Sequence, residues 1–141
     1  MMDLFCEVDG LFPSVYQFYD SVVNPSLEQS NKEYIFTNVQ EAVRLAKEVA
    51  TRCPAQAAAA KKVVLPVWVY TWMRYHGTPN LVSNQDAKMY WEQSYAAGAT
   101  GLVLWGDEPT KTMALEFGAW WQTNFTAMIN SWQPAPPWMG R

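Results

Sequence analysis

Aromatic side chains next to carboxylates are the most chemically suggestive residues in this sequence. In AGATGLVLWGDE, residues 97–108, Trp105 follows three apolar residues and precedes a glycine and two carboxylates. A short apolar run of this kind predicts a buried strand, and parallel α/β folds bind ligands at the carboxyl ends of their strands. An aromatic ring placed there can pack against the C–H face of a sugar. This stretch therefore points to a carbohydrate-facing site around Trp105.

Similar residues follow the ends of the other predicted strands. They are Tyr16, Tyr70, Trp72, Tyr75 and His76. Ring faces suit the apolar face of a sugar, and the phenol and indole tips suit its hydroxyl or amide groups. An alternative stays open for Tyr70 and Trp72, which could instead belong to the core.

The carboxylates do not form a catalytic pair by spacing. Asp107 and Glu108 are adjacent, so in an extended chain they point to opposite sides and cannot act on one bond as acid and base. We expect them to begin the next helix, and we expect Glu7 and Asp9 to be solvated.

Metal and cofactor chemistry find no support in the pattern. His76 is the single histidine, in a predicted exposed loop, and the sequence has neither a glycine-rich phosphate loop nor Cys/His metal spacing. We therefore expect no metal and no cofactor.

Three strands and three helices would have to position these residues. The predicted strands are residues 11–18, 63–71 and 102–105, and the predicted helices are residues 39–50, 84–97 and a segment starting near Pro109. The continuous apolar character of the last two strands is typical of strands buried on both faces. We expect residues 17–37 to be a long loop.

Capping signals set the predicted helix ends. Asn38 and Glu41 resemble a capping box for the first helix, and Pro54 marks its end. Ser83 can cap the second helix, which Gly98 can end. The third helix should turn four residues inward: Met113, Phe117, Trp120 and Trp121.

The order β-α-β-α-β-α predicts an α/β fold with about three parallel strands. Two architectures fit: a small three-stranded layer, or part of a (β/α) barrel, whose full form needs about 250 residues. The 141 residues suggest one domain, covering residues 1–132, and a proline-rich irregular tail over residues 133–141.

Composition excludes some classes of partner. The net charge of −3 gives no attraction to nucleic acid or anionic lipid, and no apolar run is long enough to span a membrane. Cys6 and Cys53 are either two free thiols or one bridge. No signal peptide is visible, so the chain is either intracellular or lacks its true N-terminus. Asn124 lies in a glycosylation sequon, which matters only for a secreted chain.

Four segments carry a family resemblance. They are LFPSVY (11–16), VQEAVRLAKEVA (39–50), VLPVWVYTW (64–72) and GATGLVLWG (98–106). In this order, and at about this spacing, they resemble the hyaluronidase family of glycoside hydrolases, and the likeness extends over residues 11–130.

The resemblance implies a distorted (β/α) barrel that hydrolyses hyaluronan at β-1,4 bonds next to N-acetylglucosamine. In that mechanism the substrate's acetamido carbonyl attacks the anomeric carbon, and one Glu is the general acid. By resemblance, Tyr16 positions the acetamido group, Trp105 packs against its methyl group, and Trp72 lies near the cleft floor. The implied partner is hyaluronan or a chondroitin-like glycosaminoglycan, and the implied location is secreted or lysosomal.

The sequence departs from the family pattern in four places. It contains no Asp-x-Glu motif, so the general acid is absent. Val67 and Met73 replace a usual Tyr and an Asp found in some members, and a cysteine expected near Leu115 is missing. We therefore expect the C-terminal half of a hyaluronidase-like barrel, inactive alone. The alternatives are a non-catalytic carbohydrate-binding module and a small α/β interaction protein.

Overall fold

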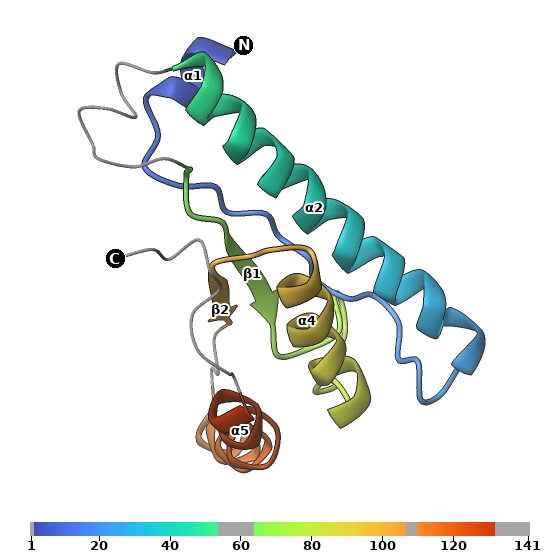
Figure 1. Cartoon of the computed structure of the whole chain (residues 1–141). Coiled ribbons are helices and arrows are strands. Elements are labelled where there is room, and N and C mark those ends of the chain that lie inside the picture. The colour runs from blue at the N-terminus through green and yellow to red at the C-terminus, as the bar shows by residue number, and fades with distance from the viewer. Residues whose placement is uncertain (1, 54–63, 107–109, 132–141) are drawn as a thin grey trace.

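The computed structural model describes residues 2–53, 64–106 and 110–131. In chain order the elements are α1 (Met2–Cys6), the 3₁₀ helix η1 (Pro25–Leu27), α2 (Glu28–Arg52), β1 (Trp68–Trp72), α4 (Asn84–Ala96), β2 (Gly101–Trp105) and α5 (Lys111–Ser131). Figure 1 shows α2 along one side of the molecule, with α4 and the two strands beside it. The predicted alternation of helices and parallel strands is confirmed from α2 onward.

The sheet consists of two regular parallel strands and one irregular segment. β1 and β2 pair from Trp68 opposite Gly101 to Trp72 opposite Trp105. Residues 11–14 lie along the other edge of β1 through two isolated parallel bridges, Leu11 to Val67 and Ser14 to Tyr70. The prediction of a third regular strand over residues 11–18 is thus corrected.

Pro13 explains the interruption. The Leu11 N–H donates to Pro66 O and the Tyr70 N–H donates to the Pro13 carbonyl, at 2.9 and 2.8 Å. A regular ladder would need a donor from residue 13 between these two bonds, and proline has no N–H.

The helices that the structure describes cover one face of the sheet and leave the other uncovered. Val69, Thr71 and Met73 are buried on the helix side, whereas the alternate residues of β1 are exposed or half-buried. The apolar core joins this face to Ile35 of α2 and Tyr90 of α4. The prediction that the strands are buried on both faces is therefore wrong for the described residues.

Helix α2 begins eleven residues before its predicted start. The Asn38 side chain, expected to cap the helix, lies inside it and donates to the Tyr34 carbonyl at 2.7 Å. Pro25 begins η1, which leads directly into α2. The buried stripe also starts earlier, because Ile35 lies one turn before Val39. The predicted long loop is correspondingly shorter.

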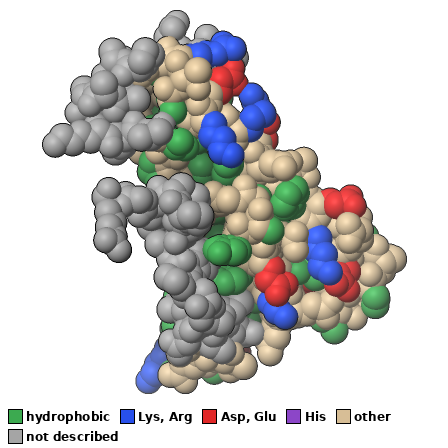
Figure 2. Space-filling model, viewed as in Figure 1, with side chains coloured by type: hydrophobic (Ala, Val, Ile, Leu, Met, Phe, Trp, Pro, Cys, Tyr) green, Lys and Arg blue, Asp and Glu red, His purple; other side chains and the backbone are tan. Residues whose placement is uncertain are grey.

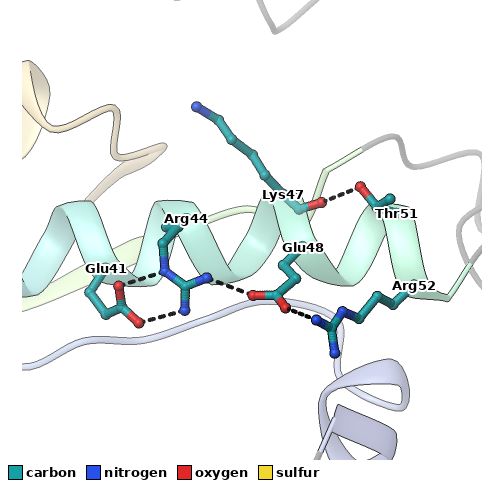
Figure 3. A network of polar contacts seen from close by, with 6 residues as sticks. All are labelled: Glu41, Arg44, Lys47, Glu48, Thr51 and Arg52. Carbon is teal, nitrogen blue, oxygen red and sulfur yellow. Dashed lines mark hydrogen bonds and ion pairs between the residues drawn. The ribbon is translucent and has the colours of Figure 1, made fainter.

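Charged side chains line the exposed side of α2. Arg44 bonds to both Glu41 and Glu48, at 2.7 and 2.6 Å, and Arg52 bonds to Glu48 at 2.6 Å (Figure 3). The hydrogen bond from Arg44 lowers the pKa of Glu41. Water screens these pairs, so they add little stability. Basic and acidic side chains are interspersed across the face in Figure 2.

The other two helices agree with their sequence signals. The Ser83 side chain accepts the Asp86 N–H at 3.1 Å at the start of α4, and Gly98 follows the helix with a φ of 94°. Helix α5 buries Trp120, whose indole N–H donates to the Val82 carbonyl at 2.6 Å. Pro109 lies outside the described residues, as does the predicted tail.

A disulfide joins Cys6 to Cys53 and settles the question of free thiols. Their Cα atoms are 5.7 Å apart, and the bridge connects α1 to the residue that ends α2. No helix among the described residues is long and apolar enough to cross a membrane.

Candidate functional site

The register of the sheet places three of the predicted site residues in one row. Both bridges from residues 11–14 to β1 have the same register, and continuing it by two residues puts Tyr16 level with Trp72. Trp72 in turn pairs with Trp105 of β2. Residues level with one another on paired strands point to the same face, here the face without helices.

The rings of these three residues contact one another. The Tyr16 and Trp105 centroids are 6.2 Å apart with an interplanar angle of 17°, so the rings are stacked. Trp72 is 5.9 Å from Tyr16 and 6.2 Å from Trp105. These distances lie in the usual range for aromatic pairs. The structure therefore brings Tyr16, Trp72 and Trp105 together at the carboxyl ends of β1 and β2.

Two further rings join this group. His76 stacks on Tyr16 at 6.5 Å and lies 5.9 Å from Trp72, and Phe18 is 4.8 Å from His76. The sequence placed His76 among the candidate residues after the strands and predicted that it is exposed, which is correct, and it did not single out Phe18. We refer to Tyr16, Phe18, Trp72, His76 and Trp105 as the aromatic cluster.

Two other predicted residues lie outside the cluster. Tyr70 is one row back from the strand ends, where its ring meets the edge of Phe12 at 6.0 Å. Tyr75 is buried, and its hydroxyl takes part in a polar network described below. Asp107 and Glu108 lie outside the described residues. Asn124 is within α5, but its side chain is not among those that the structure describes.

Gly106 allows the close packing at the end of β2. Its φ is 156°, and a Cβ there would lie 2.8 Å from the Trp72 indole nitrogen. That nitrogen is buried and has no hydrogen-bond partner among the described residues. A side chain at residue 106 would therefore push directly on a ring of the cluster.

A buried carboxylate on α4 holds the segment that follows Tyr16. Asp86 is fully buried, and its Oδ2 accepts the Ser21 N–H at 2.9 Å and the Tyr75 hydroxyl at 2.7 Å. Its Oδ1 accepts the Ser21 hydroxyl. The Tyr75 hydroxyl also accepts the Ser83 N–H at 3.0 Å. Asp86 thus ties two loops to the start of α4.

Gln17 links the same loops next to the cluster. Its N–H donates to the Tyr90 hydroxyl at 2.8 Å, and its side chain donates to the Asp86 carbonyl at 3.2 Å. Its carbonyl accepts the His76 N–H at 2.7 Å. Burial raises the pKa of both Tyr75 and Tyr90. These bonds fix the backbone on either side of the rings.

The side chains of the cluster are suited to binding a ligand with apolar and polar faces. Its rings offer apolar faces, with hydroxyl and N–H groups at their edges, and none of its members is a carboxylate. Within the described ranges, no three His, Cys, Asp or Glu side chains are placed to hold a metal ion.

Comparison with known proteins gives one consistent result. The family model described as hyaluronidase matches residues 1–118. Human hyaluronidase-2 (Homo sapiens) is 34% identical over 104 residues, covering 74% of this chain and 19% of that protein. This chain thus spans about a fifth of the curated relative.

Two crystal structures of bee venom hyaluronidase share the fold. Each superposes with a TM-score of 0.71 at 23% identity over 89% of this chain, which covers 36% of one solved chain and 35% of the other. The second of them is a complex with a hyaluronic acid tetramer.

Proposed function

Because the chain belongs to the hyaluronidase family, we propose that its aromatic cluster binds a hyaluronan-type sugar chain. The activity proposed for the whole protein is hydrolysis of β-1,4 bonds next to N-acetylglucosamine, assisted by the substrate. The observation that carries the proposal is the row of Tyr16, Trp72 and Trp105 at the carboxyl ends of the strands. The hyaluronic acid tetramer in the bee venom complex supports the same class of ligand.

We infer that the chain is a part of a (β/α) barrel. Its strands are parallel, helices cover one face of the sheet, and the rings occupy the other face. In a closed barrel this second face would point inward. The chain's coverage of about a third of the bee venom enzyme supports such a partial barrel.

The three residues of the row have distinct proposed roles. Tyr16 would position the acetamido group, because its hydroxyl has no hydrogen bond with the described part of the chain and can reach a ligand. Trp105 would pack against the acetamido methyl group, and its exposed ring suits that role. Trp72 would form the floor between them.

Catalysis requires residues that this sequence lacks. With no Asp-x-Glu motif there is no general acid of the family type, and such an acid typically contributes about 10²–10⁴-fold to the rate. We therefore propose that the chain alone does not hydrolyse hyaluronan. The same absence favours the second candidate, a non-catalytic carbohydrate-binding or interaction module derived from the barrel.

The disulfide supports a secreted or lysosomal location. Bridges such as Cys6–Cys53 form in oxidising compartments and are rare in the cytosol. Asn124 would be a glycosylation acceptor there.

The test is binding of a hyaluronan tetrasaccharide to the purified chain, measured by calorimetry. Trp105→Ala should weaken binding about tenfold, because it removes a stacking surface of the size that aromatic contacts supply. Trp68→Ala is the matched control, since Trp68 lies on the same sheet face at the other end of β1. Equal losses in both variants, or no binding by the natural chain, would refute the proposal.

Hydrolysis is tested separately. Incubation of the chain with hyaluronan should release no new reducing ends. Turnover that disappears when a residue of this chain is replaced would show that the chain carries its own acid.

A further inference from the structure

We propose that His76 binds the carboxylate of the acidic sugar next to the one held by Tyr16 and Trp105. This inference rests on the proposed function and adds a second recognition element to it. The structure places an imidazole where a simple aromatic platform would have another Phe or Tyr. An imidazole N–H can donate to a carboxylate, and hyaluronan carries carboxylates along its length.

The first argument is position. Tyr16 stacks with Trp105 at 17° and with His76 at 14°, so the three rings are nearly parallel. Trp105 and His76 each contact Tyr16, but no ring contact joins the two to each other among the described residues. The cluster therefore extends past the Tyr16–Trp105 pair to His76.

The second argument is that His76 is held in place. Its backbone N–H donates to the Gln17 carbonyl at 2.7 Å, and the Gln17 backbone N–H donates to the Tyr90 hydroxyl. The ring itself contacts Phe18, Tyr16 and Trp72. A donor that is already ordered loses little conformational entropy when a ligand binds.

The third argument is that the imidazole has hydrogen-bonding capacity to spare. His76 is exposed, and its ring nitrogens bond to none of the described residues. A hydrogen bond from N–H to an ionised carboxylate is about twice as strong as one to a neutral acceptor. An acidic sugar therefore gains more from this residue than a neutral one does.

Neighbouring charged groups on the same two loops are already engaged. The Asp86 carboxylate is buried and bonded to Ser21 and Tyr75. Asp20 accepts the N–H groups of Val22 and Val23 at 2.8 and 3.2 Å. Arg74 is buried and donates to the Pro79 carbonyl. His76 is thus the group of this set that faces solvent with its side-chain donor available.

The experiment compares two ligands that differ only in the carboxylate. One is a hyaluronan tetrasaccharide, and the other is the same tetrasaccharide with its carboxyl groups reduced to alcohols. His76→Phe keeps a ring and removes the donor. The natural chain should bind the acid about tenfold more tightly than the alcohol, and His76→Phe should bind the two equally.

The outcomes separate this inference from the proposed function. If the natural chain binds both ligands equally, or if His76→Phe weakens both by the same factor, His76 only packs and the inference fails. Trp105→Ala should weaken both ligands together, and that result would leave the proposed function standing. If the natural chain binds neither ligand, the proposed function fails, and this inference with it.

A second measurement needs no substitution. His76 is the single histidine of the chain, so its imidazole proton resonances are unique. They should shift on titration with the acidic tetrasaccharide and stay in place with the reduced one. Equal shifts with both ligands contradict the inference.

Discussion

Tyr16 and Trp72 contact each other and form the centre of the aromatic cluster, because each also contacts His76 and Trp105. The sequence could predict the row of Tyr16, Trp72 and Trp105, since each follows an apolar run that predicts a strand. It could not predict the contact of His76 with Tyr16. That contact joins two loops whose backbones are linked by the hydrogen bond from the His76 backbone N–H to the Gln17 carbonyl, and no local sequence pattern encodes such a link.

At the residue scale, Gly106→Ala should distort the cluster. The added Cβ would lie 2.8 Å from the Trp72 indole, a rigid ring, at a backbone φ of 156° that side chains rarely adopt. We expect a loss of about 1–3 kcal/mol in the free energy of unfolding. Urea denaturation measures this loss, and near-ultraviolet circular dichroism should change with it.

Gly118→Ala is the matched control for this substitution. Gly118 lies within α5, and a Cβ there meets nothing within 4 Å. Alanine should therefore stabilise the helix by about 0.5–1 kcal/mol. The two variants should change stability in opposite directions; a loss in both would mean that packing at Gly106 is not the cause.

At the element scale, α4 positions the site from behind the sheet. Its start was predictable because Ser83, Asp86 and Gly98 are strong local signals, and the structure confirms their use. The start of α2 could not be predicted, because Asn38 and Glu41 have the spacing of a capping box but lie inside the helix. The apolar stripe of that helix continues back to Ile35. The irregularity of residues 11–14 could be foreseen in part from Pro13.

The hydrogen bonds of α4 make stability sensitive to alkaline pH. Burial raises the pKa of Tyr90 and Tyr75 above 10.0, their ordinary value. The folded chain therefore holds these protons more tightly than the unfolded chain does. Their contribution is complete below about pH 10 and is lost as the pH rises above it. Urea midpoints should be flat from pH 8 to 9.5 and fall between pH 10 and 11.

Tyr90→Phe tests the assignment. This variant loses the bond from the Gln17 N–H, so it should be less stable at pH 8, and its further loss between pH 10 and 11 should be smaller. If Tyr90→Phe loses as much stability between pH 10 and 11 as the natural chain does, other groups, such as lysines, cause the effect.

At the scale of the whole molecule, one face of the sheet is covered by none of the described helices. Phe12, Trp68 and Trp105 are 58%, 38% and 51% exposed on it. Apolar area of this kind promotes association, and so does an unpaired strand edge. The order of elements could be predicted from the sequence. The uncovered face was expected only from the half-barrel interpretation, because the same apolar strands taken alone would suit a sheet covered on both sides.

We therefore expect the isolated chain to self-associate and to have a low melting temperature. Sedimentation velocity should show a weight-average mass that rises with concentration, and Trp68→Ser should reduce that rise. A dilute monomer with a sharp cooperative melt would contradict the partial barrel and favour a complete small domain.

The disulfide should offset part of this weakness. Cys6 and Cys53 are separated by 47 residues, and closing a loop of that length contributes up to about 4 kcal/mol through the unfolded chain. Cys6→Ser with Cys53→Ser should lower the free energy of unfolding by several kcal/mol. Reductant should destabilise the natural chain and leave the double variant unchanged, and equal effects on both would count against the bridge.

The position of this bridge also bears on the order in which the chain is made. Both cysteines precede β1, so the bridge can close while the later residues are still on the ribosome. Residues 11–14, which later bond to β1, lie inside the closed ring. A covalent ring closed at that stage would hold one edge of the sheet before β1 and β2 are made.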